Sequence, residues 1–413
     1  MEAMLRDEKG ADVVVVGGGP AGATTAFWLA RAGVDVLLVD RARFPRTKPC
    51  AEYLSPQSSR VLDAMGVLHA IERSGAAQLA GMRVRSAAGT SFEGRFLAGH
   101  GYRGFRDRGL ALPRFELDAI LLAAAREAGA RVIEGWKVLD VAQDSRGRAI
   151  GVVGERETLH ARLVVGADGL RSVVARRLRL ARRSASRERF AFVAHFTGVD
   201  GIGDHGEMHV AADGYVGLAD IGRGRTNVAL VVPGSHAAAA RSGAAAFLDR
   251  WLAAQPQLAP RFARAARTTP VQVTGPFASH AKRAWASGAA LVGDAADFFD
   301  PFTGEGIYSA LRGGELLAPF AERAARASGP READAALRDY DRAHRNEFRG
   351  KWLVERLIGL AVAHPPLLDR CARVLARRRE MADLLVGVAG DFVPPREVLR
   401  ARFLLDLLRP APR

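Results

Sequence analysis

Residues 12–22, DVVVVGGGPAG, and residues 34–40, VDVLLVD, form the stretch of sequence that decides the fold. The run over 12–16 is short, apolar and β-branched, which is typical of a strand buried on both faces. The pattern then predicts a helix over 20–32 and a second buried strand over 34–39. A strand, a helix and a strand in this order indicate a βαβ unit of a parallel sheet with a right-handed crossover.

The glycines between the first strand and the helix have the spacing of a dinucleotide-binding turn. Gly17 allows the tight turn, Gly19 lets the backbone approach a pyrophosphate, and Gly22 lets the helix pack closely against the strand. The helix begins at Pro20 and Ala21, so its positive end faces the expected phosphates. The sequence therefore predicts a pyrophosphate site at this turn.

An acidic residue stands where such a fold binds a ribose. Asp40 ends the second predicted strand, and Arg41 follows it. A carboxylate at this place accepts hydrogen bonds from ribose hydroxyls. The chain has one such fingerprint and no CxxC redox pair. A nicotinamide cofactor would therefore have no binding domain of its own and would have to bind transiently beside the first dinucleotide.

The rest of the chain alternates between two patterns. Helical, strand-like and buried-strand segments continue the first fold, whereas the segment over 190–232 alternates apolar and polar residues between glycine-rich turns, which predicts an antiparallel sheet. From residue 350 onward the chain is expected to be helical. The segments of the first kind are a helix over 114–129, strands over 131–141, 149–153, 163–165 and 289–292, and helices over 56–65 and from Ile307.

The composition of the 413 residues excludes several classes of protein. No apolar run reaches the about 18–20 residues that span a bilayer, and the N-terminus lacks a signal-peptide pattern, so we expect a cytoplasmic protein. Two cysteines, Cys50 and Cys371, exclude a disulfide framework or a zinc spacing, and no metal is expected. The net charge of +15 is spread along amphipathic helices, which favours anionic small molecules or a membrane surface over nucleic acid.

Five ordered motifs resemble one superfamily. They read GGGPAG, FPRTKPCAEYLSP, LPRFELD, VVGADGLRSVVAR and LVGDAADFFDPFTGEGIYSAL, and they cover most of residues 11–320. In this combination the chain resembles the FAD-dependent superfamily that contains class A flavoprotein monooxygenases, flavin-dependent halogenases and geranylgeranyl reductases. The resemblance implies FAD as the cofactor and NAD(P)H as the reductant.

The resemblance also implies the residues that bind FAD. The acid of the GD motif binds the ribityl and phosphate part, and the loop after the proline packs its amides against the pyrimidine edge of the flavin. Asp168 would lie near the pyrophosphate and take part in nicotinamide use, and Arg114 would reach the FAD, although a structural ion pair is an alternative for that arginine. The GD motif and the loop comprise Gly293, Asp294, Pro301, Gly304, Gly306 and Ile307.

The expected fold is α/β: a Rossmann-like FAD-binding domain with an inserted antiparallel β-sheet substrate domain and a C-terminal helical region. The FAD-binding domain is expected in three parts, over 1–80, 113–188 and 276–325. The substrate domain takes 81–112 and 189–275, and the helical region takes 326–413.

Four side chains are candidates for the chemistry. Cys50 lies in the loop after the second strand, where prenyl reductases have a similar KPC segment near the flavin, although a lone cysteine is also a common packing residue. His195 and His209 lie on the predicted antiparallel sheet and could relay a proton or serve as hydrogen-bonded structural residues. Tyr215 begins the segment YVGLAD on the same sheet.

Two motifs that distinguish subfamilies by their reaction are missing from this chain. Halogenases carry a WxWxIP segment that has no match here, and prenyl reductases carry YxWxFP, where this chain has Gly217, Ala219 and Asp220. We therefore expect an NAD(P)H-dependent FAD monooxygenase that hydroxylates an aromatic or polyketide-like small molecule of secondary metabolism. The alternative is a geranylgeranyl-reductase-like reductase, or a dehydrogenase, acting on carbon–carbon double bonds of a lipophilic substrate. A redox partner as electron source, a peripheral membrane contact and a flavin-binding protein without turnover stay open.

Overall fold

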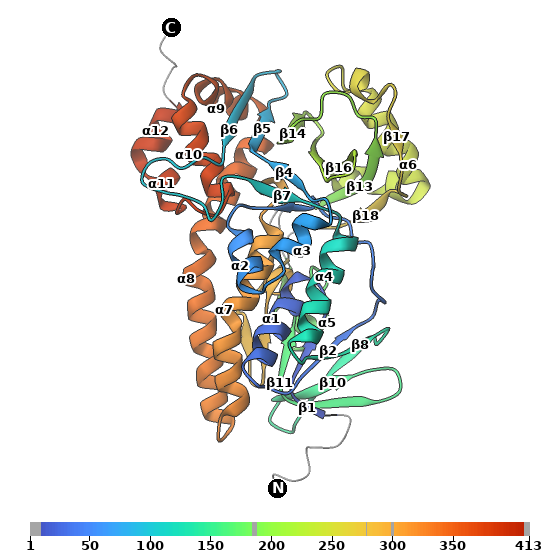
Figure 1. Ribbon diagram of the computed structural model, residues 1–413, viewed down its shortest axis with the longest axis vertical. Helices are drawn as coiled ribbons and strands as arrows, with labels where there is room; N and C mark the ends of the chain where they lie inside the picture. The colour runs from blue at the N-terminus through green and yellow to red at the C-terminus, as the bar shows by residue number, and fades with distance from the viewer. Residues whose placement is uncertain (1–9, 184–187, 278, 299–300, 409–413) are drawn as a thin grey trace.

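The computed structural model describes residues 10–183, 188–277, 279–298 and 301–408. A parallel sheet with its helices occupies the lower half of Figure 1, and an antiparallel sheet and the C-terminal helices occupy the upper half. The chain is thus α/β, with a Rossmann-like part, an antiparallel sheet and a helical region.

The parallel sheet is built around a βαβ unit. Its strands are β1 (Gly10–Val16), β2 (Val36–Asp40), β8 (Arg131–Glu134), β11 (Thr158–Gly166) and β21 (Ala289–Leu291). The spatial order is β21-β11-β1-β2-β8, and all four neighbouring pairs are parallel. The valines of β1 are buried, as expected for a central strand of a parallel sheet. The antiparallel strands β9 (Asp140–Gln143), β10 (Ala149–Val153) and β20 (Trp285–Ala286) extend it.

The helices that accompany the parallel sheet come from both the N-terminal and the C-terminal portions of the chain. Helix α1 (Pro20–Arg31) packs between α4 (Arg114–Glu127) and α7 (Gly306–Arg326), and α7 packs in turn on the long helix α8 (Pro330–Ala363). Shorter helices, α2 (Ser58–Ala64), α3 (Leu68–Arg73) and α5 (Val173–Arg177), cover the remaining edges.

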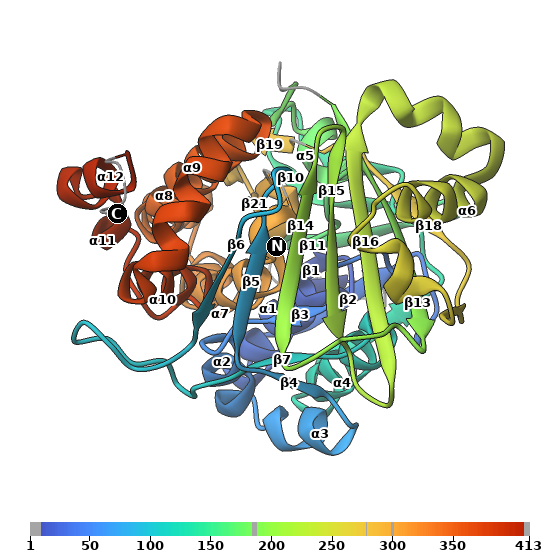
Figure 2. The same cartoon turned by 90° about the horizontal axis from the view of Figure 1, so that it is seen from above.

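The second sheet stands above the first and is mostly antiparallel (Figure 2). Its order is β17-β13-β16-β15-β14-β5-β6, with β18 also paired to β13, and only the β14–β5 pair is parallel. Helix α6 (Ala237–Ala253) packs against its outer side. The strands are β5 (Gly81–Arg85), β6 (Ser91–Arg95), β13 (Arg189–Thr197), β14 (His205–Ala211), β15 (Gly214–Asp220), β16 (Arg225–Pro233), β17 (Ala266–Arg267) and β18 (Gln272–Thr274).

Two small sheets and four helices complete the molecule. One sheet joins β3 (Tyr53–Leu54), β7 (Gly109–Ala111) and β4 (Ala77–Leu79), and the other joins β12 (Ala181–Arg183), β19 (Ser279–Ala281) and β22 (Asp297–Phe298). The last helices are α9 (Pro365–Arg377), α10 (Arg379–Ala389), α11 (Arg396–Leu399) and α12 (Ala401–Leu408) (Figure 1). Of these, α9 and α10 pack against β6, and α11 and α12 pack on neighbouring helices. Over the described residues, no helix combines the length and the apolar character needed to cross a bilayer.

Local elements differ from the sequence prediction at a few places. The segment over 131–141 is two strands, β8 and β9, because the chain turns at Gly135, whose φ is 78°. Helix α3 was not predicted, and α8 begins at Pro330, within the helical region predicted over 326–413 but ahead of residue 350, from which the pattern indicated helix. The latter difference arises because α8 is charged over its first turns and gains its stability from packing on α7.

Candidate functional site

The turn after β1 has the geometry of a phosphate-binding loop. Gly17 has a φ of 105°, and a Cβ atom there would lie 2.5 Å from the carbonyl oxygen of Ala167. At Gly22 a Cβ atom would lie 1.8 Å from the carbonyl oxygen of Gly17, so only glycine lets α1 approach β1 this closely. No described side chain caps the N-terminus of α1. Its first amides are therefore available to an anion.

Asp40 holds the turn in place from the end of β2. Its Oδ2 accepts a hydrogen bond of 2.7 Å from the amide of Gly18, and its Oδ1 accepts one of 2.7 Å from the amide of Ala42. Each carboxylate oxygen keeps further acceptor capacity for a ribose hydroxyl. Arg41, the next residue, is exposed to solvent.

Two guanidinium groups lie in front of Gly19. A Cβ atom at that glycine would lie 3.6 Å from Nη2 of Arg46 and 3.7 Å from Nη2 of Arg114. The buried Asp118 positions both groups: it pairs with Arg114 at 2.7 and 2.8 Å and with Nη1 of Arg46 at 2.8 Å. Burial lowers the pKa of Arg114, but Asp118 outweighs this and holds that pKa above its ordinary value. Two fixed positive charges thus face the uncapped end of α1.

Lys48 and Asp294 continue this charged cluster along the cleft. Burial and the nearby Arg114 lower the pKa of Lys48. Burial raises the pKa of Asp294, against the opposing influence of Lys48 and Arg114. Asp294 follows Gly293, whose φ is 63°, directly after β21, so the turn presents the carboxyl group to the cleft. We call Arg46, Lys48, Arg114, Asp118 and Asp294 the cationic cluster.

The glycine-rich loop before α7 forms the floor of the cleft. The amide of Gly304 donates a hydrogen bond of 3.1 Å to the carbonyl of Pro301, and Gly304 has a φ of 72°. Gly306 begins α7, and a Cβ atom there would meet nothing within 4 Å. The N-terminus of α7 and Ile307 therefore open onto the cleft and could stabilise negative charge there.

The cleft runs from the cationic cluster to the antiparallel sheet and has about 1670 Å³ of empty space, including the part open to solvent. Its sheet wall is almost entirely apolar, and its other walls come from loops and from α8. The apolar lining residues of the sheet are Ala191, Val193, Met208, Gly217, Ala229 and Val231.

The residues fit FAD on three observations. The uncapped end of α1 with its two guanidinium groups suits a pyrophosphate, and Asp40 keeps acceptor capacity for a ribose. The open backbone at Gly306 leaves space for a flat ring against the end of α7. FAD would thus be held by its phosphates at α1 and would reach along the cleft past Asp294 toward α7.

Asp168 lies at the turn after β11 and holds a helix end. Its Oδ2 accepts hydrogen bonds of 2.6 Å from the amide of Val173 and 3.3 Å from that of Val174. Burial raises the pKa of Asp168, although these hydrogen bonds oppose the shift. The contacts place it at the N-terminus of α5, and its part in nicotinamide use stays a prediction.

Cys50 lines the cleft beside the cationic cluster. Its thiol contacts the guanidinium of Arg114, and its carbonyl accepts a hydrogen bond of 2.9 Å from Nδ2 of Asn227 on β16. The second contact ties the loop after β2 to the antiparallel sheet. Cys50 therefore stands where the two parts of the molecule meet.

His195 lies on β13 but is not among the described residues that line the cleft. Its Nε2 is 2.8 Å from Oε2 of Glu52, and Oε1 of Glu52 accepts a hydrogen bond of 2.9 Å from the amide of Arg114. Glu52 is buried and has a φ of 60°, a conformation that is uncommon for a side chain other than glycine. His195 is thus connected to the site through Glu52.

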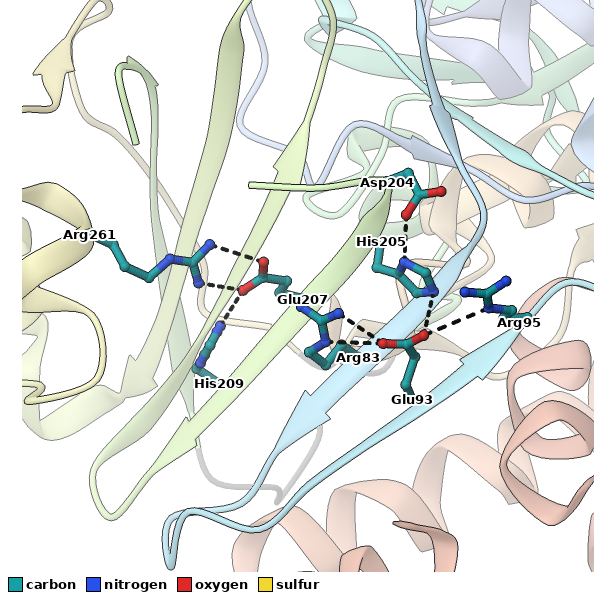
Figure 3. Close-up of polar contacts among 8 residues, drawn as sticks. All are labelled: Arg83, Glu93, Arg95, Asp204, His205, Glu207, His209 and Arg261. Atoms are coloured by element: carbon teal, nitrogen blue, oxygen red, sulfur yellow. Dashed lines mark hydrogen bonds and ion pairs between the residues drawn. The ribbon is translucent and has the colours of Figure 1, made fainter. Parts of the chain in front are cut away.

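His209 lies on the face of β14 that points away from the cleft, because neighbouring residues of a strand alternate and Met208 faces the cleft. Figure 3 shows its contact with Glu207, at 2.7 Å, and the two contacts of Glu207 with Arg261, at 2.6 and 3.0 Å. Burial raises the pKa of Glu207, but His209 and Arg261 outweigh it and lower that pKa to about 2. Tyr215, in contrast, lines the cleft and packs edge-to-face on Phe302, with ring centroids 5.0 Å apart.

Several residues of the site were not predicted. Arg46 and Lys48 are in the quoted FPRTKPC motif, but nothing in its spacing shows that Arg46 faces Gly19 or that Lys48 approaches Gly169. Asp118 stands four residues after Arg114, and this helical spacing was a usable signal for the ion pair. Glu52 lies in the same loop as Cys50 and shared its uncertain role, but its contact with His195 on β13 could not be predicted from the sequence.

Comparisons with known proteins agree with this geometry. A family profile described as "FAD binding domain" matches residues 10–319. Menaquinone reductase of Mycolicibacterium smegmatis is 29% identical over 411 residues, which cover 93% of this chain and 92% of that protein. Digeranylgeranylglycerophospholipid reductase 2 of Methanopyrus kandleri is 32% identical over 333 residues, with 76% and 77% covered. The structure of a myxobacterial chondrochloren halogenase matches with a TM-score of 0.74 at 27% identity, covering 83% of this chain and 81% of that one.

Proposed function

The chain belongs to the FAD-dependent oxidoreductase superfamily through its FAD binding domain, and on this premise we propose that it reduces carbon–carbon double bonds of a lipophilic, isoprenoid-containing substrate. The single observation that carries this proposal is the apolar cleft wall on the antiparallel sheet. The reductases found as relatives support it, because menaquinone and digeranylgeranyl lipids both contain isoprenoid chains.

The side chains of the sheet wall leave room for a bulky apolar group. Small residues, Ala191, Gly217 and Ala229, alternate with Val193 and Val231 on neighbouring strands. An apolar chain that enters this space is removed from water, which favours binding by roughly 25 cal/mol for each Å² buried. Gly217, where the prenyl-reductase motif has tryptophan, lines the cleft without a side chain and so leaves that space to a substrate.

The protein's own residues have distinct tasks in this reaction. Arg46, Arg114 and the end of α1 bind the pyrophosphate, and Asp294 orients the ribityl part. FAD, when bound and reduced, supplies the hydride equivalent. The thiol of Cys50 is the proposed proton donor to the substrate carbon, and the adjacent Arg114 would stabilise the thiolate that remains. Solvent then returns the proton to the sulfur.

The test is an anaerobic assay of the FAD-loaded protein, with its flavin first reduced by dithionite, with menaquinone and with a geranylgeranyl lipid, analysed by mass spectrometry. We expect a product that gains two hydrogen atoms per reduced double bond, and a Cys50→Ala variant slowed by about 10²–10⁴-fold with unchanged FAD content. Wild-type turnover in that variant would exclude a chemical role for the thiol. No reduced product from either lipid would remove the proposal itself.

Hydroxylation, the first expectation from the sequence, is tested in the same preparation. Anaerobic reduction with NADPH or NADH, followed by mixing with oxygenated buffer, would give a transient absorbance of a flavin–oxygen adduct if the chain is a monooxygenase. Reduction by neither nucleotide would point to a redox partner as the electron source. Smooth reoxidation without a transient, with candidate phenols present, supports double-bond reduction.

A membrane contact would deliver such a substrate. On the exposed side of α8, Leu353, Leu357 and Leu360 are 47%, 38% and 50% exposed and are spaced one helical turn apart. The exposed Arg349 and Arg356 lie on the same side, which suits an anionic lipid surface. We expect co-sedimentation with vesicles that contain phosphatidylglycerol, weakened in a Leu357→Glu variant and absent with vesicles of phosphatidylcholine alone. Equal binding of the variant would exclude this face.

A further inference from the structure

A second buried ionic cluster lies at the far end of the cleft. Nζ of Lys351, on α8, is 3.0 Å from Oε2 of Glu305 and also contacts the carboxylate of Asp391. All three side chains are at most 10% exposed. Glu305 is the residue before α7, and Asp391 follows α10, so the cluster joins the cleft floor to the C-terminal helices. We call these three residues the acidic cluster.

The acidic cluster contains two acids and one base. With all three groups ionised its net charge is −1, in a buried place where an excess charge is costly. Tyr53, Tyr308 and Ser55 face it, and Nζ of Lys351 lies 4.4 Å from the centre of the Tyr308 ring. Beyond Tyr308 lie Arg312 and Glu347, which pair with each other.

Protonation of one carboxylate would relieve this excess. Burial raises the pKa of Asp391 to about 7, helped by Glu305 and opposed by Lys351. Burial lowers the pKa of Lys351, but the two acids outweigh it and raise that pKa, so the ammonium stays charged. The cluster can therefore exchange a proton near neutral pH without losing its ion pair.

The cluster also borders the place where the cofactor gains charge. Glu305 and Lys351 line the cleft, and Glu305 immediately precedes Gly306, where α7 opens toward it. FAD that is held by its phosphates at Gly19 would extend along the cleft past Asp294 toward this end. Two-electron reduction adds negative charge to the ring, which the neighbouring carboxylates would disfavour.

We propose that Glu305, Lys351 and Asp391 form a proton-storage site that takes up one proton from solvent when the bound flavin is reduced and releases it on reoxidation. The electrons stay on the flavin, and the stored proton bonds to a carboxylate oxygen of the acidic cluster. The cluster then changes from a net charge of −1 to neutral as the ring becomes negative. This inference depends on FAD binding and is independent of the substrate.

The stored proton changes the pH dependence of flavin reduction. A flavin that gains two electrons and one proton has a reduction equilibrium constant that falls about tenfold for each unit rise in pH. With a second proton taken up by the acidic cluster, the fall becomes about 100-fold per unit around neutral pH. Removing one acid leaves Lys351 paired with a single carboxylate, with no excess charge. The reduction equilibrium constant should then fall only about tenfold for each unit rise in pH.

The experiment equilibrates the FAD-loaded protein anaerobically with reference dyes between about pH 5.5 and 8.5. It compares the wild type with Asp391→Asn and Glu305→Gln, and with Glu315→Gln as a control. Glu315 is also part-buried and paired with arginines, Arg60 and Arg312, but it is not among the described cleft-lining residues. The absorbance spectrum of the reduced flavin shows whether the ring itself is anionic.

We expect the wild type and Glu315→Gln to show the steeper dependence with an anionic reduced ring, and the two cluster variants to show the shallower one. A tenfold dependence in the wild type would overturn the proposal. So would a steep dependence that persists in both cluster variants, since the second proton would then reside on the flavin. If Asp391→Asn fails to fold, Glu305→Gln and the wild-type slope still decide.

Discussion

The two ends of the cleft each have a buried ionic cluster, and the two clusters have opposite net charge. The cationic cluster has three bases, Arg46, Lys48 and Arg114, against two acids, Asp118 and Asp294. The acidic cluster has two acids against one base, as described above. A buried charge needs partners in either place, but the excess charge differs, in the sense expected if one end binds the phosphates of FAD and the other lies beside its ring.

The two clusters also differ in how they are assembled. The ion pair of Arg114 and Asp118 lies within one turn of α4, so local spacing brings it together. The acidic cluster takes one residue from each of three elements that are 40 or more positions apart, and its formation needs α7, α8 and the turn after α10 to be packed. The Arg114–Asp118 pair of the cationic cluster is thus locally encoded, whereas the acidic cluster depends entirely on the tertiary fold.

The largest effect is expected at the cationic cluster. Arg114→Ala leaves the buried Asp118 with Arg46 alone, which should cost about 3–5 kcal/mol of unfolding free energy and most of the bound FAD. Arg126→Ala, on the exposed side of the same helix, is the control and should cost at most about 1 kcal/mol. Urea unfolding and the ratio of FAD to protein measure both. Full FAD content in Arg114→Ala would show that this arginine is only structural.

A slightly smaller effect is expected at the acidic cluster. Lys351→Met leaves two buried carboxylates together, and at pH 8 this should lower the unfolding free energy by about 3 kcal/mol. The loss should shrink at about pH 5.5, where a proton can replace the ammonium. Lys137→Met, at an exposed position, serves as control. A loss that does not depend on pH would mean that lost packing, and not charge, explains the effect.

A third prediction concerns His344, which lines the cleft between the clusters. Burial lowers the pKa of His344 from 6.5 to about 4, although Asp297 and Asp341 oppose the shift. The unfolded chain therefore takes up a proton below pH 6.5 that the folded protein does not. Stability is fully present above pH 6.5 and should fall by up to about 3 kcal/mol as the pH drops to 4. In thermal unfolding, His344→Leu should show a flatter profile over this range; an unchanged profile would contradict this assignment.

The smallest effect is expected at His195. His195→Gln keeps a donor toward Glu52, so we expect a loss of only about 0.5–1.5 kcal/mol and full FAD content. His195→Leu removes the donor and should cost more, because Glu52 would be left buried without it. Chemical unfolding of the two variants measures the difference. A large loss of turnover in His195→Gln with normal stability would instead assign this histidine to the chemistry.

The sequence was informative where a backbone constraint lies within a few residues. Gly17 and Gly22 have no space for a side chain, so their spacing alone indicates the turn, and Asp40 follows from the strand that ends there. The same holds for the loop from Pro301 to Gly306, although Phe299 and Asp300 of that motif lie outside the described residues. These positions are readable because each constraint is local.

The sequence was less informative where contacts cross between elements. It suggested two histidines on one sheet as equal candidates, but the structure places His195 against Glu52 and turns His209 away from the cleft toward Glu207. Neighbouring residues of a strand point to opposite faces of the sheet. Which of the two faces lines the cleft depends on how the sheet packs against the rest of the protein. No pattern in the sequence specifies how the sheet packs against the rest of the protein.

The sequence by itself determined that this chain has an FAD-binding βαβ unit, an inserted antiparallel sheet and a helical end, because strand and helix periods and glycine turns are properties of neighbouring residues. The tertiary structure alone decided which charges meet. Arg46 faces Gly19, Lys48 approaches Gly169, and Lys351 lies between Glu305 and Asp391, only after the loop, α7 and α8 have packed. The physical reason is that a buried charge is set by its partners in space, which the order of residues along the chain does not specify.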